Sequence, residues 1–148
     1  KTFVVKLLSN LHVHLESPCP NSLLLGKPYE SRDRSAAALP GDAGDEQARY
    51  IEGRVATRQG PLTVGGLYLP NGNPIGTEKF AYKLAWMARL QQRARTLLAR
   101  EEMFVLGGDY NVCPTDMDVY SPTAFADDAL CQPQSRQALR GLLNVEPD

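Results

Sequence analysis

The sequence has little that would indicate a membrane protein or a partner of strong opposite charge. Its 148 residues carry a formal net charge of −1, so the whole chain makes no electrostatic case for binding nucleic acid or a membrane surface. No apolar run approaches the roughly 18 residues of a membrane span. Internal repeats and low-complexity segments are also missing. The length and the apolar content of 43% favour one globular domain with a hydrophobic core.

Cysteine is scarce, and its pattern excludes two further classes of protein. The three cysteines, Cys19, Cys113 and Cys131, are an odd number and include no C-x-x-C pair. This argues against a disulfide framework or a zinc knuckle and favours a reducing, cytoplasmic location. The first residues are not a signal peptide, because no long apolar region precedes a small-residue cleavage site. They also lack an initiating Met, so we expect the chain to be part of a larger protein.

Residues 1–38 carry the weakest pattern. Residues 11–15 alternate between apolar and polar, as in a half-buried strand, which places His12 and His14 on the same side. Two histidines at this spacing could bind zinc, but no third ligand lies nearby in the sequence, and a solvated strand face is the simpler interpretation. We treat residues 1–38 as a divergent N-terminal segment and 39–148 as the organised part.

Two strands and a turn follow in the organised part. Residues 50–56 alternate between apolar and polar, which indicates a strand with one face in the core. Residues 59–61, Gln-Gly-Pro, form a turn, and residues 62–69 form the partner strand. The sequence therefore predicts an antiparallel hairpin. Residues 70–74, Pro-Asn-Gly-Asn-Pro, end the second strand abruptly and place polar groups at an edge of the sheet.

The clearest helix begins after Thr77, a good N-cap, with Glu78 in its first turn. Apolar residues recur at spacings of three and four and form one stripe. The stripe consists of Phe80, Leu84, Met87, Leu90, Ala94, Leu97 and Leu98. Trp86 lies off the centre of this stripe, and packing in the core or an interface is its expected role.

The other helix face is basic. It carries Lys79, Lys83, Arg89, Arg93, Arg95 and Arg100. The distal arginines are most simply a solvated face. Lys79 and Lys83 lie one turn apart close to the Pro-Asn-Gly loop, so they could help to hold a phosphate backbone. The ordinary alternative for them is the same solvated face.

The chain is organised around residues 103–111. Met103 to Leu106 is a short apolar run that reads as a buried strand, and two glycines then let the backbone turn or approach a ligand. Asp109 and Asn111 follow at the carboxyl end of this strand, where open α/β sheets bind ligands. A carboxylate and an amide at this spacing can serve one hard metal ion or one phosphate. An Asx turn without such a function is the alternative.

An acidic loop and a short helix complete the chain. Asp116 and Asp118 could join Asp109 in a metal site, although solvated loop acids are the simpler interpretation because nothing in the sequence fixes them near Asp109. Apolar residues within 135–143 recur at helical spacing and predict a short helix.

Several ordered segments together carry a family resemblance. They are residues 45–52, 66–72 (Gly-Leu-Tyr-Leu-Pro-Asn-Gly), 79–84 (Lys-Phe-Ala-Tyr-Lys-Leu), 106–111 (Leu-Gly-Gly-Asp-Tyr-Asn) with Pro114 and Asp118, and 130–136. In this order they resemble exonuclease III, the bacterial branch of the endonuclease/exonuclease/phosphatase superfamily. The resemblance implies an α/β fold, a four-layer sandwich of two sheets with helices outside, which is incomplete here. Half of such a sandwich would expose one apolar sheet face.

The resemblance also implies a metal-dependent hydrolase of DNA phosphodiester bonds in base-excision repair, an exodeoxyribonuclease and abasic-site endonuclease. Asp109 matches the family aspartate that aligns or deprotonates the attacking water. Asn111 matches the amide that donates to a phosphate oxygen, and Tyr68 matches a tyrosine whose phenol assists the phosphate or the leaving group.

The remaining implied contacts concern the DNA and the metal. Asn71 matches the position that would hold the DNA backbone, and Lys79 and Lys83 would assist it. Asp109 and Asn111 would contact Mg²⁺ or Mn²⁺, since oxygen ligands favour hard ions. The implied partner is double-stranded DNA with abasic sites or 3′ ends, and the full-length enzyme is expected to be a monomer that does not bind membranes.

This sequence departs from the family pattern at both ends. The family has an Asn near its start and a metal-binding Glu in a Glu-Thr-Lys-like stretch, and neither motif is present here. Its closing Ser-Asp-His motif and the preceding Asp would lie beyond residue 148. Residues 4–37 lose the match, as a divergent or frame-shifted segment would. Two alternatives follow: an inactive fragment or DNA-binding remnant of the fold, or a phosphatase of the same superfamily with a small phosphoester substrate.

Overall fold

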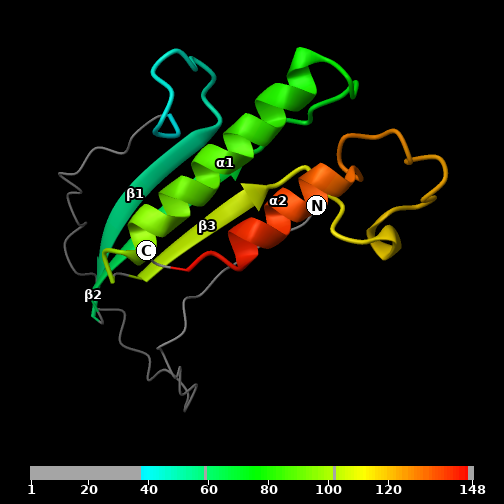
Figure 1. The fold of residues 1–148 in the computed structure, drawn as a ribbon. Coiled ribbons are helices and arrows are strands. Elements are labelled where there is room, and N and C mark those ends of the chain that lie inside the picture. The colour runs from blue at the N-terminus through cyan, green and yellow to red at the C-terminus, as the bar shows by residue number, and fades with distance from the viewer. Residues whose placement is uncertain (1–37, 59, 102, 147–148) are drawn as a thin grey trace.

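The computed structural model describes residues 38–58, 60–101 and 103–146, and within them a three-stranded sheet with two helices (Figure 1). The elements in chain order are β1 (Tyr50–Thr57), β2 (Gly60–Tyr68), α1 (Glu78–Leu98), β3 (Met103–Asp109), the 3-10 turn η1 (Asp116–Asp118) and α2 (Pro133–Leu143). His12, His14 and residues 1–37 lie outside the described residues, so expectations about them stay predictions.

The predicted hairpin is confirmed. β1 and β2 pair antiparallel, with Tyr50 opposite Leu67 and Thr57 opposite Gly60. Gly60 has a φ of +118°, a value that favours glycine at the turn. The hydroxyl of Thr57 donates to the carbonyl oxygen of Gly60 over 2.6 Å and closes the turn. The hairpin therefore forms where the alternating pattern and the turn residues place it.

α1 connects β2 to β3, and these two strands are parallel neighbours in the order β1-β2-β3. The helix begins after Thr77, as expected. Its buried residues are Lys83, Trp86, Met87, Leu90, Ala94, Leu97 and Leu98. Phe80 and Leu84 are only half-buried. The buried stripe is therefore rotated from the predicted one, toward Lys83 and Trp86.

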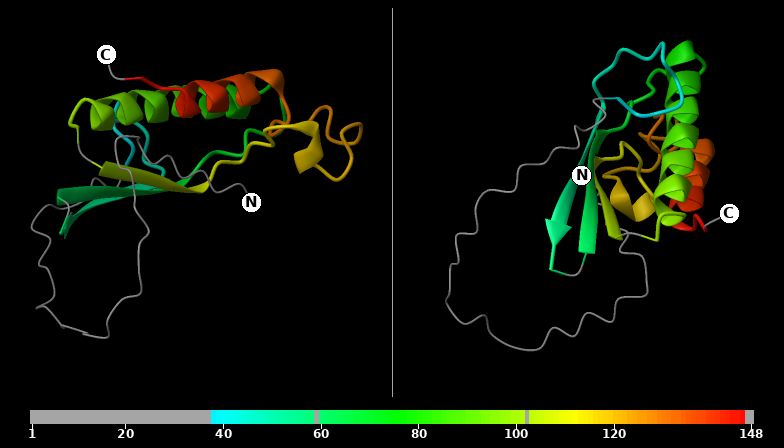
Figure 2. Two further views of the ribbon diagram at one scale, coloured as in Figure 1. Left: turned by 90° about the horizontal axis from the view of Figure 1, so that it is seen from below. Right: turned by 90° about the vertical axis from the view of Figure 1, so that its left-hand side faces the viewer.

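α2 lies beside α1 on the same face of the sheet (Figures 1 and 2). It begins two residues before the predicted start, with Pro133 in the first turn, where a missing backbone N–H is harmless. The side chain of Gln91 in α1 donates to the carbonyl oxygen of Gly141 over 3.2 Å. Leu139 and Leu142 are buried in the shared core. The two helices form one layer over the sheet.

The other face of the sheet carries exposed apolar side chains. Ile51, Val55 and Val64 are 62%, 45% and 42% exposed, and no described segment covers this face (Figure 2). This agrees with the expected exposure of a sheet face in an incomplete sandwich. Among the described helices, none is long and apolar enough to cross a membrane.

Candidate active site

The carboxyl ends of β2 and β3 bring together two of the predicted site residues. Tyr68 lies directly opposite Asp109 in the parallel register, and each ends its strand. The backbone N–H of Leu69 donates to the carbonyl oxygen of Asp109 over 2.9 Å, so the pairing continues one step past Tyr68. The loops after both strands therefore leave the sheet side by side, at the edge where α/β proteins bind ligands.

The loop after β3 is an Asx turn. Asp109 Oδ1 accepts from the backbone N–H of Asn111 over 3.0 Å. Asn111 has a φ of +45°, a left-handed conformation that asparagine tolerates better than most residues. Its Nδ2 donates to the carbonyl oxygen of Leu69 over 2.7 Å. Since an amide group has two N–H donors and an acceptor oxygen, Asn111 keeps one donor and Oδ1 for a ligand. The Asx turn is therefore compatible with a role for Asp109 and Asn111 in binding a metal ion or a phosphate.

Lys83 is placed differently from the expectation that it would contact a phosphate. Its side chain is 0% exposed. The ammonium donates to the carbonyl oxygen of Pro70 over 3.1 Å and to that of Asn111 over 2.6 Å. Burial lowers the pKa of Lys83 to about 8, although the charges of Asp128 and Asp109 act in the opposite direction. In this structure Lys83 bridges two loops instead of facing solvent.

Lys79 and Asn71 remain at the surface. Both are exposed. Asn71 Oδ1 accepts from the backbone N–H of Asn73 over 3.1 Å, so the loop after β2 is itself an Asx turn. Asn73 Oδ1 in turn accepts from the backbone N–H of Ala129 over 2.8 Å. Lys79 and Lys83 therefore do not act as a pair, because the first is exposed and the second is enclosed.

Arg49 belongs to the surroundings of Tyr68, and the sequence analysis missed it. Its guanidinium carbon lies 5.5 Å from the centre of the Tyr68 ring, within cation–π range. Arg49 Nη1 donates to the carbonyl oxygen of Tyr68 over 3.4 Å, and the backbone N–H of Tyr68 donates to the carbonyl oxygen of Arg49 over 2.9 Å. The Tyr68 side chain remains 54% exposed. The hairpin register was the available signal, since it places residue 49 opposite residue 68.

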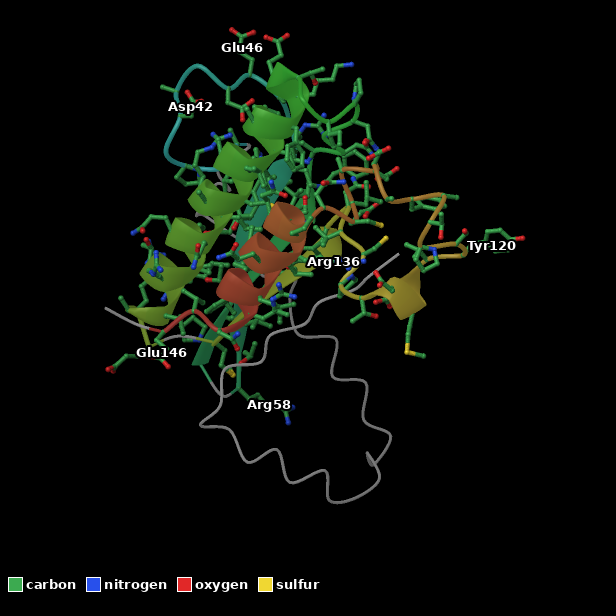
Figure 3. The ribbon with its side chains drawn as sticks, turned by 45° about the vertical axis from the view of Figure 1, so that its right-hand side comes forward. Asp42, Glu46, Arg58, Tyr120, Arg136 and Glu146 are labelled. Atoms are coloured by element: carbon green, nitrogen blue, oxygen red, sulfur yellow. The ribbon has the colours of Figure 1, made fainter. Side chains whose placement is uncertain are left out.

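The acidic loop does not supply a metal cluster. Asp118 accepts from both the backbone N–H and the hydroxyl of Thr115, which lowers the pKa of Asp118. Asp116 is paired with Arg136 at 2.8 Å. Figure 3 shows Tyr120 pointing away from the body at the end of this loop, and it is 99% exposed. No group of three or more His, Cys, Asp or Glu side chains among the described residues could hold a metal ion.

The oxygen atoms at the strand ends are of the chemical type that binds a hard metal ion. Asp109 offers a carboxylate and Asn111 an amide oxygen, the ligand types that Mg²⁺ and Mn²⁺ prefer. Asp109 and Asn111 alone do not fill the coordination sphere of a hard metal ion, which takes about six oxygen ligands. A complete coordination sphere would therefore need water, phosphate oxygens or ligands from elsewhere.

Comparison with known proteins finds proteins similar to this chain. No family model matches the chain. Exodeoxyribonuclease III of Haemophilus influenzae is 34% identical over 82 residues, which cover 55% of this chain and 31% of that protein. An AP endonuclease from Archaeoglobus fulgidus superposes with a TM-score of 0.64 at 29% identity, covering 74% of this chain and 40% of the other.

Two structures from Neisseria extend this similarity. The 3′-5′ exonuclease of Neisseria meningitidis superposes with a TM-score of 0.67 at 31% identity and covers 75% of this chain and 42% of that one. A Neisseria 3′ phosphatase bound to a product DNA hairpin gives a TM-score of 0.68. This chain thus spans between 31% and 42% of the length of these relatives. This chain is similar to part of exodeoxyribonuclease III, and its described elements form an incomplete α/β fold like that of these structural neighbours.

Proposed function

We propose that residues 39–148 form the central part of a catalytic domain that hydrolyses DNA phosphodiester bonds with a bound metal ion. The observation that carries this proposal is the pairing of Tyr68 with Asp109 at the ends of two parallel strands, with the side chain of Asn111 donating across to the carbonyl oxygen of Leu69 in the other loop. A phenol, a carboxylate and an amide then converge at one sheet edge. The similarity to exodeoxyribonuclease III gives this convergence its chemical interpretation.

The reaction explains why these three groups are needed. A phosphodiester repels hydroxide, so the site must align a water molecule and supply positive charge. Asp109 aligns or deprotonates the water, and Asn111 donates to a phosphate oxygen as charge develops. The phenol of Tyr68 donates a hydrogen bond to the phosphate or, as phenolate, stabilises the leaving group. Mg²⁺ or Mn²⁺, held by Asp109 and Asn111, would neutralise phosphate charge.

The substrate we propose is duplex DNA at abasic sites and 3′ ends. One of the structural neighbours is bound to a DNA hairpin, and others are named as an AP endonuclease and a 3′-5′ exonuclease. Asn71, in the loop after β2, and Lys79, in the first turn of α1, are exposed and would hold the DNA backbone. We further propose that the whole protein acts as a monomer in the cytoplasm, a compartment that suits the free thiols of Cys113 and Cys131.

A non-catalytic remnant of the fold is the second candidate. It is favoured by the small number of metal donors, since the described residues contain no cluster of three or more His, Cys, Asp or Glu side chains that could hold a metal ion. Such a chain would keep the loops at the strand ends and bind DNA without cutting it.

Cleavage of a duplex oligonucleotide with one abasic-site analogue separates these candidates. The full chain is assayed with Mg²⁺ and with chelator, beside Asp109→Asn and a matched control, Asp116→Asn. Asp116 is exposed and, within the described residues, forms a salt bridge with Arg136. Metal-dependent cutting that falls by at least about 100-fold in Asp109→Asn and persists in Asp116→Asn supports the enzyme.

Binding without cutting supports the remnant. In that case the affinity should fall steeply with salt, because phosphate contacts release counterions. A small phosphoester would not show this dependence, so rapid hydrolysis of such a substrate with no salt effect would favour a phosphatase. A folded sample that neither binds nor cuts DNA would contradict both candidates.

A further inference from the structure

Lys83 bridges the two loops that carry the proposed catalytic side chains. One acceptor, the carbonyl of Pro70, lies two residues after Tyr68, and the other, the carbonyl of Asn111, lies two residues after Asp109. The donor comes from α1, the helix that connects the two strands. One ammonium group therefore joins the two loops at equivalent positions, each two residues after the end of its strand.

Burying the ammonium group of Lys83 between two loops carries a desolvation penalty. An uncompensated charge is strongly disfavoured in the protein interior, so buried lysines normally pair with a carboxylate. Within the described part of the chain, no carboxylate forms a salt bridge with Lys83. Asp128 and Asp109 attract its charge from farther away. The direct partners are two backbone carbonyls, which an apolar side chain at this position could not satisfy.

The stem of Lys83 is enclosed as tightly as its ammonium. Gly72 has a φ of +89°, and a Cβ atom there would lie 2.6 Å from Cδ of Lys83. The same position would meet the side chain of Ala129 at 3.3 Å. The loop after β2 thus closes directly over the lysine, and only glycine permits this approach. Because the Lys83 side chain is held both at its stem and at its ammonium group, it fixes where the two loops lie relative to each other.

We propose that Lys83 is a positioning residue that sets the placement of the Tyr68 loop relative to the Asp109–Asn111 loop. It acts through these loops and does not contact the substrate. This inference rests on the proposed function for its catalytic consequence, since it matters to the reaction only if Tyr68 and Asp109 act on one phosphate. Alignment errors of about 1 Å can cost about 100-fold in rate, so this placement governs the chemical step.

The test compares Lys83→Met with a matched core variant, Leu97→Ala. Methionine keeps an unbranched stem but has no donor, whereas Leu97 lies on the same buried stripe and contacts neither loop by hydrogen bonds. Lys83→Arg retains the charge and the donors and is the conservative variant. All three are assayed as full chains below their unfolding transitions, for kcat, for KM and for amide hydrogen exchange of residues 68–74 and 108–113.

We expect Lys83→Met to lower kcat by about 10- to 100-fold with little change in KM, and to speed exchange in both loops. Leu97→Ala should lose stability without either effect, and Lys83→Arg should recover part of kcat. Unchanged exchange in both loops of Lys83→Met, or an equal loss of kcat in Leu97→Ala, would overturn the proposal. If the wild-type chain does not cut DNA, the proposed function fails in this chain, but the exchange comparison still decides whether Lys83 links the loops.

Discussion

Gly108 runs so close to Leu67 on the neighbouring strand that a Cβ atom on Gly108 would lie 1.9 Å from the carbonyl oxygen of Leu67. The two residues are partners in the parallel register, one step before Tyr68 and Asp109. Gly108 also has a φ of +147°, which side chains rarely adopt. The pairing that aligns Tyr68 with Asp109 therefore depends on the absence of a side chain at this position.

Gly108→Ala should consequently separate the ends of β2 and β3. We expect the free energy of unfolding to fall by about 2–4 kcal/mol in urea denaturation, because either the strand pairing or the backbone must move. Gly107→Ala is the matched control, since a Cβ atom there would meet nothing within 4 Å. Its effect should stay within about 0.5 kcal/mol. Similar losses in both variants would contradict this explanation.

The Glu52–Arg93 ion pair should make stability depend on pH. Burial alone would raise the pKa of Glu52, but hydrogen bonds from Arg93 and Tyr50 outweigh burial and hold this pKa below its ordinary 4.5. A carboxyl group with a lowered folded-state pKa stabilises the fold above its unfolded pKa, and this stabilisation is lost as the pH falls. Glu52→Gln should therefore cost about 1–3 kcal/mol at neutral pH and much less in acid.

Urea unfolding of wild type and Glu52→Gln on both sides of pH 4.5 measures this difference. Asp116→Asn serves as the control, because Asp116 is 69% exposed and its pair with Arg136 is screened by solvent. Its cost should stay below about 1 kcal/mol at any pH. A loss for Glu52→Gln that is the same in acid as at neutral pH would count against the ion pair.

Lys83 should also make stability rise with pH, in this case on the alkaline side. Burial lowers the pKa of Lys83 to about 8 from an ordinary 10.5. Between these two values the unfolded chain binds more protons at this site than the folded chain, so the stability contributed by Lys83 rises with pH. The free energy of unfolding of wild type minus that of Lys83→Met should increase across this window. A difference that decreases would show that the ammonium is not buried as described.

Arg49 and Tyr68 should be energetically coupled. The guanidinium lies 5.5 Å from the ring centre, and the ring is largely exposed, so we expect a coupling of about 0.5–1 kcal/mol. A double-mutant cycle with Arg49→Met and Tyr68→Leu, followed by urea unfolding, measures it. The same cycle with Tyr120, which is 99% exposed at a distant loop, should give none. Equal coupling in both cycles would exclude a specific contact.

The apolar sheet face should cause self-association. Ile51 and Val64 are 62% and 42% exposed on neighbouring strands, and faces of this kind mark interfaces or aggregation sites. Ile51→Thr with Val64→Thr should reduce association in sedimentation experiments and change the free energy of unfolding by about 0.5 kcal/mol or less. A wild-type chain that stays monomeric at high concentration would show that this face is covered in solution.

Periodicity and turn chemistry predicted most of the fold. The hairpin and α1 lie close to their predicted bounds, because alternation and an N-cap are local signals. β3 begins at the predicted Met103, but it continues through both glycines to Asp109 instead of ending at Leu106. The parallel pairing of β2 with β3 has no local signal, and only the family resemblance implied the larger fold. Trp86 is 1% exposed, which confirms its expected place in the core.

The candidate site was less predictable for a physical reason. Lys83 was assigned to the basic face because it is charged, although it precedes Met87 and Leu90 by four and seven residues and so shares their buried face. Its acceptors are backbone carbonyls, which leave no trace in the sequence. Arg49 reaches Tyr68 across the hairpin, a contact that follows only from the register.

The bridge from α1 to both loops has a consequence for how the protein folds. The carboxylate and the phenol come from segments separated by about forty residues, and the side chain that joins them sits on the connecting helix. The proposed catalytic edge can therefore not form as a local unit during folding. It appears only when the crossover has closed and the helix has docked, so partly folded chains should lack it altogether. An intermediate with an intact hairpin but an undocked helix would therefore lack the proposed site.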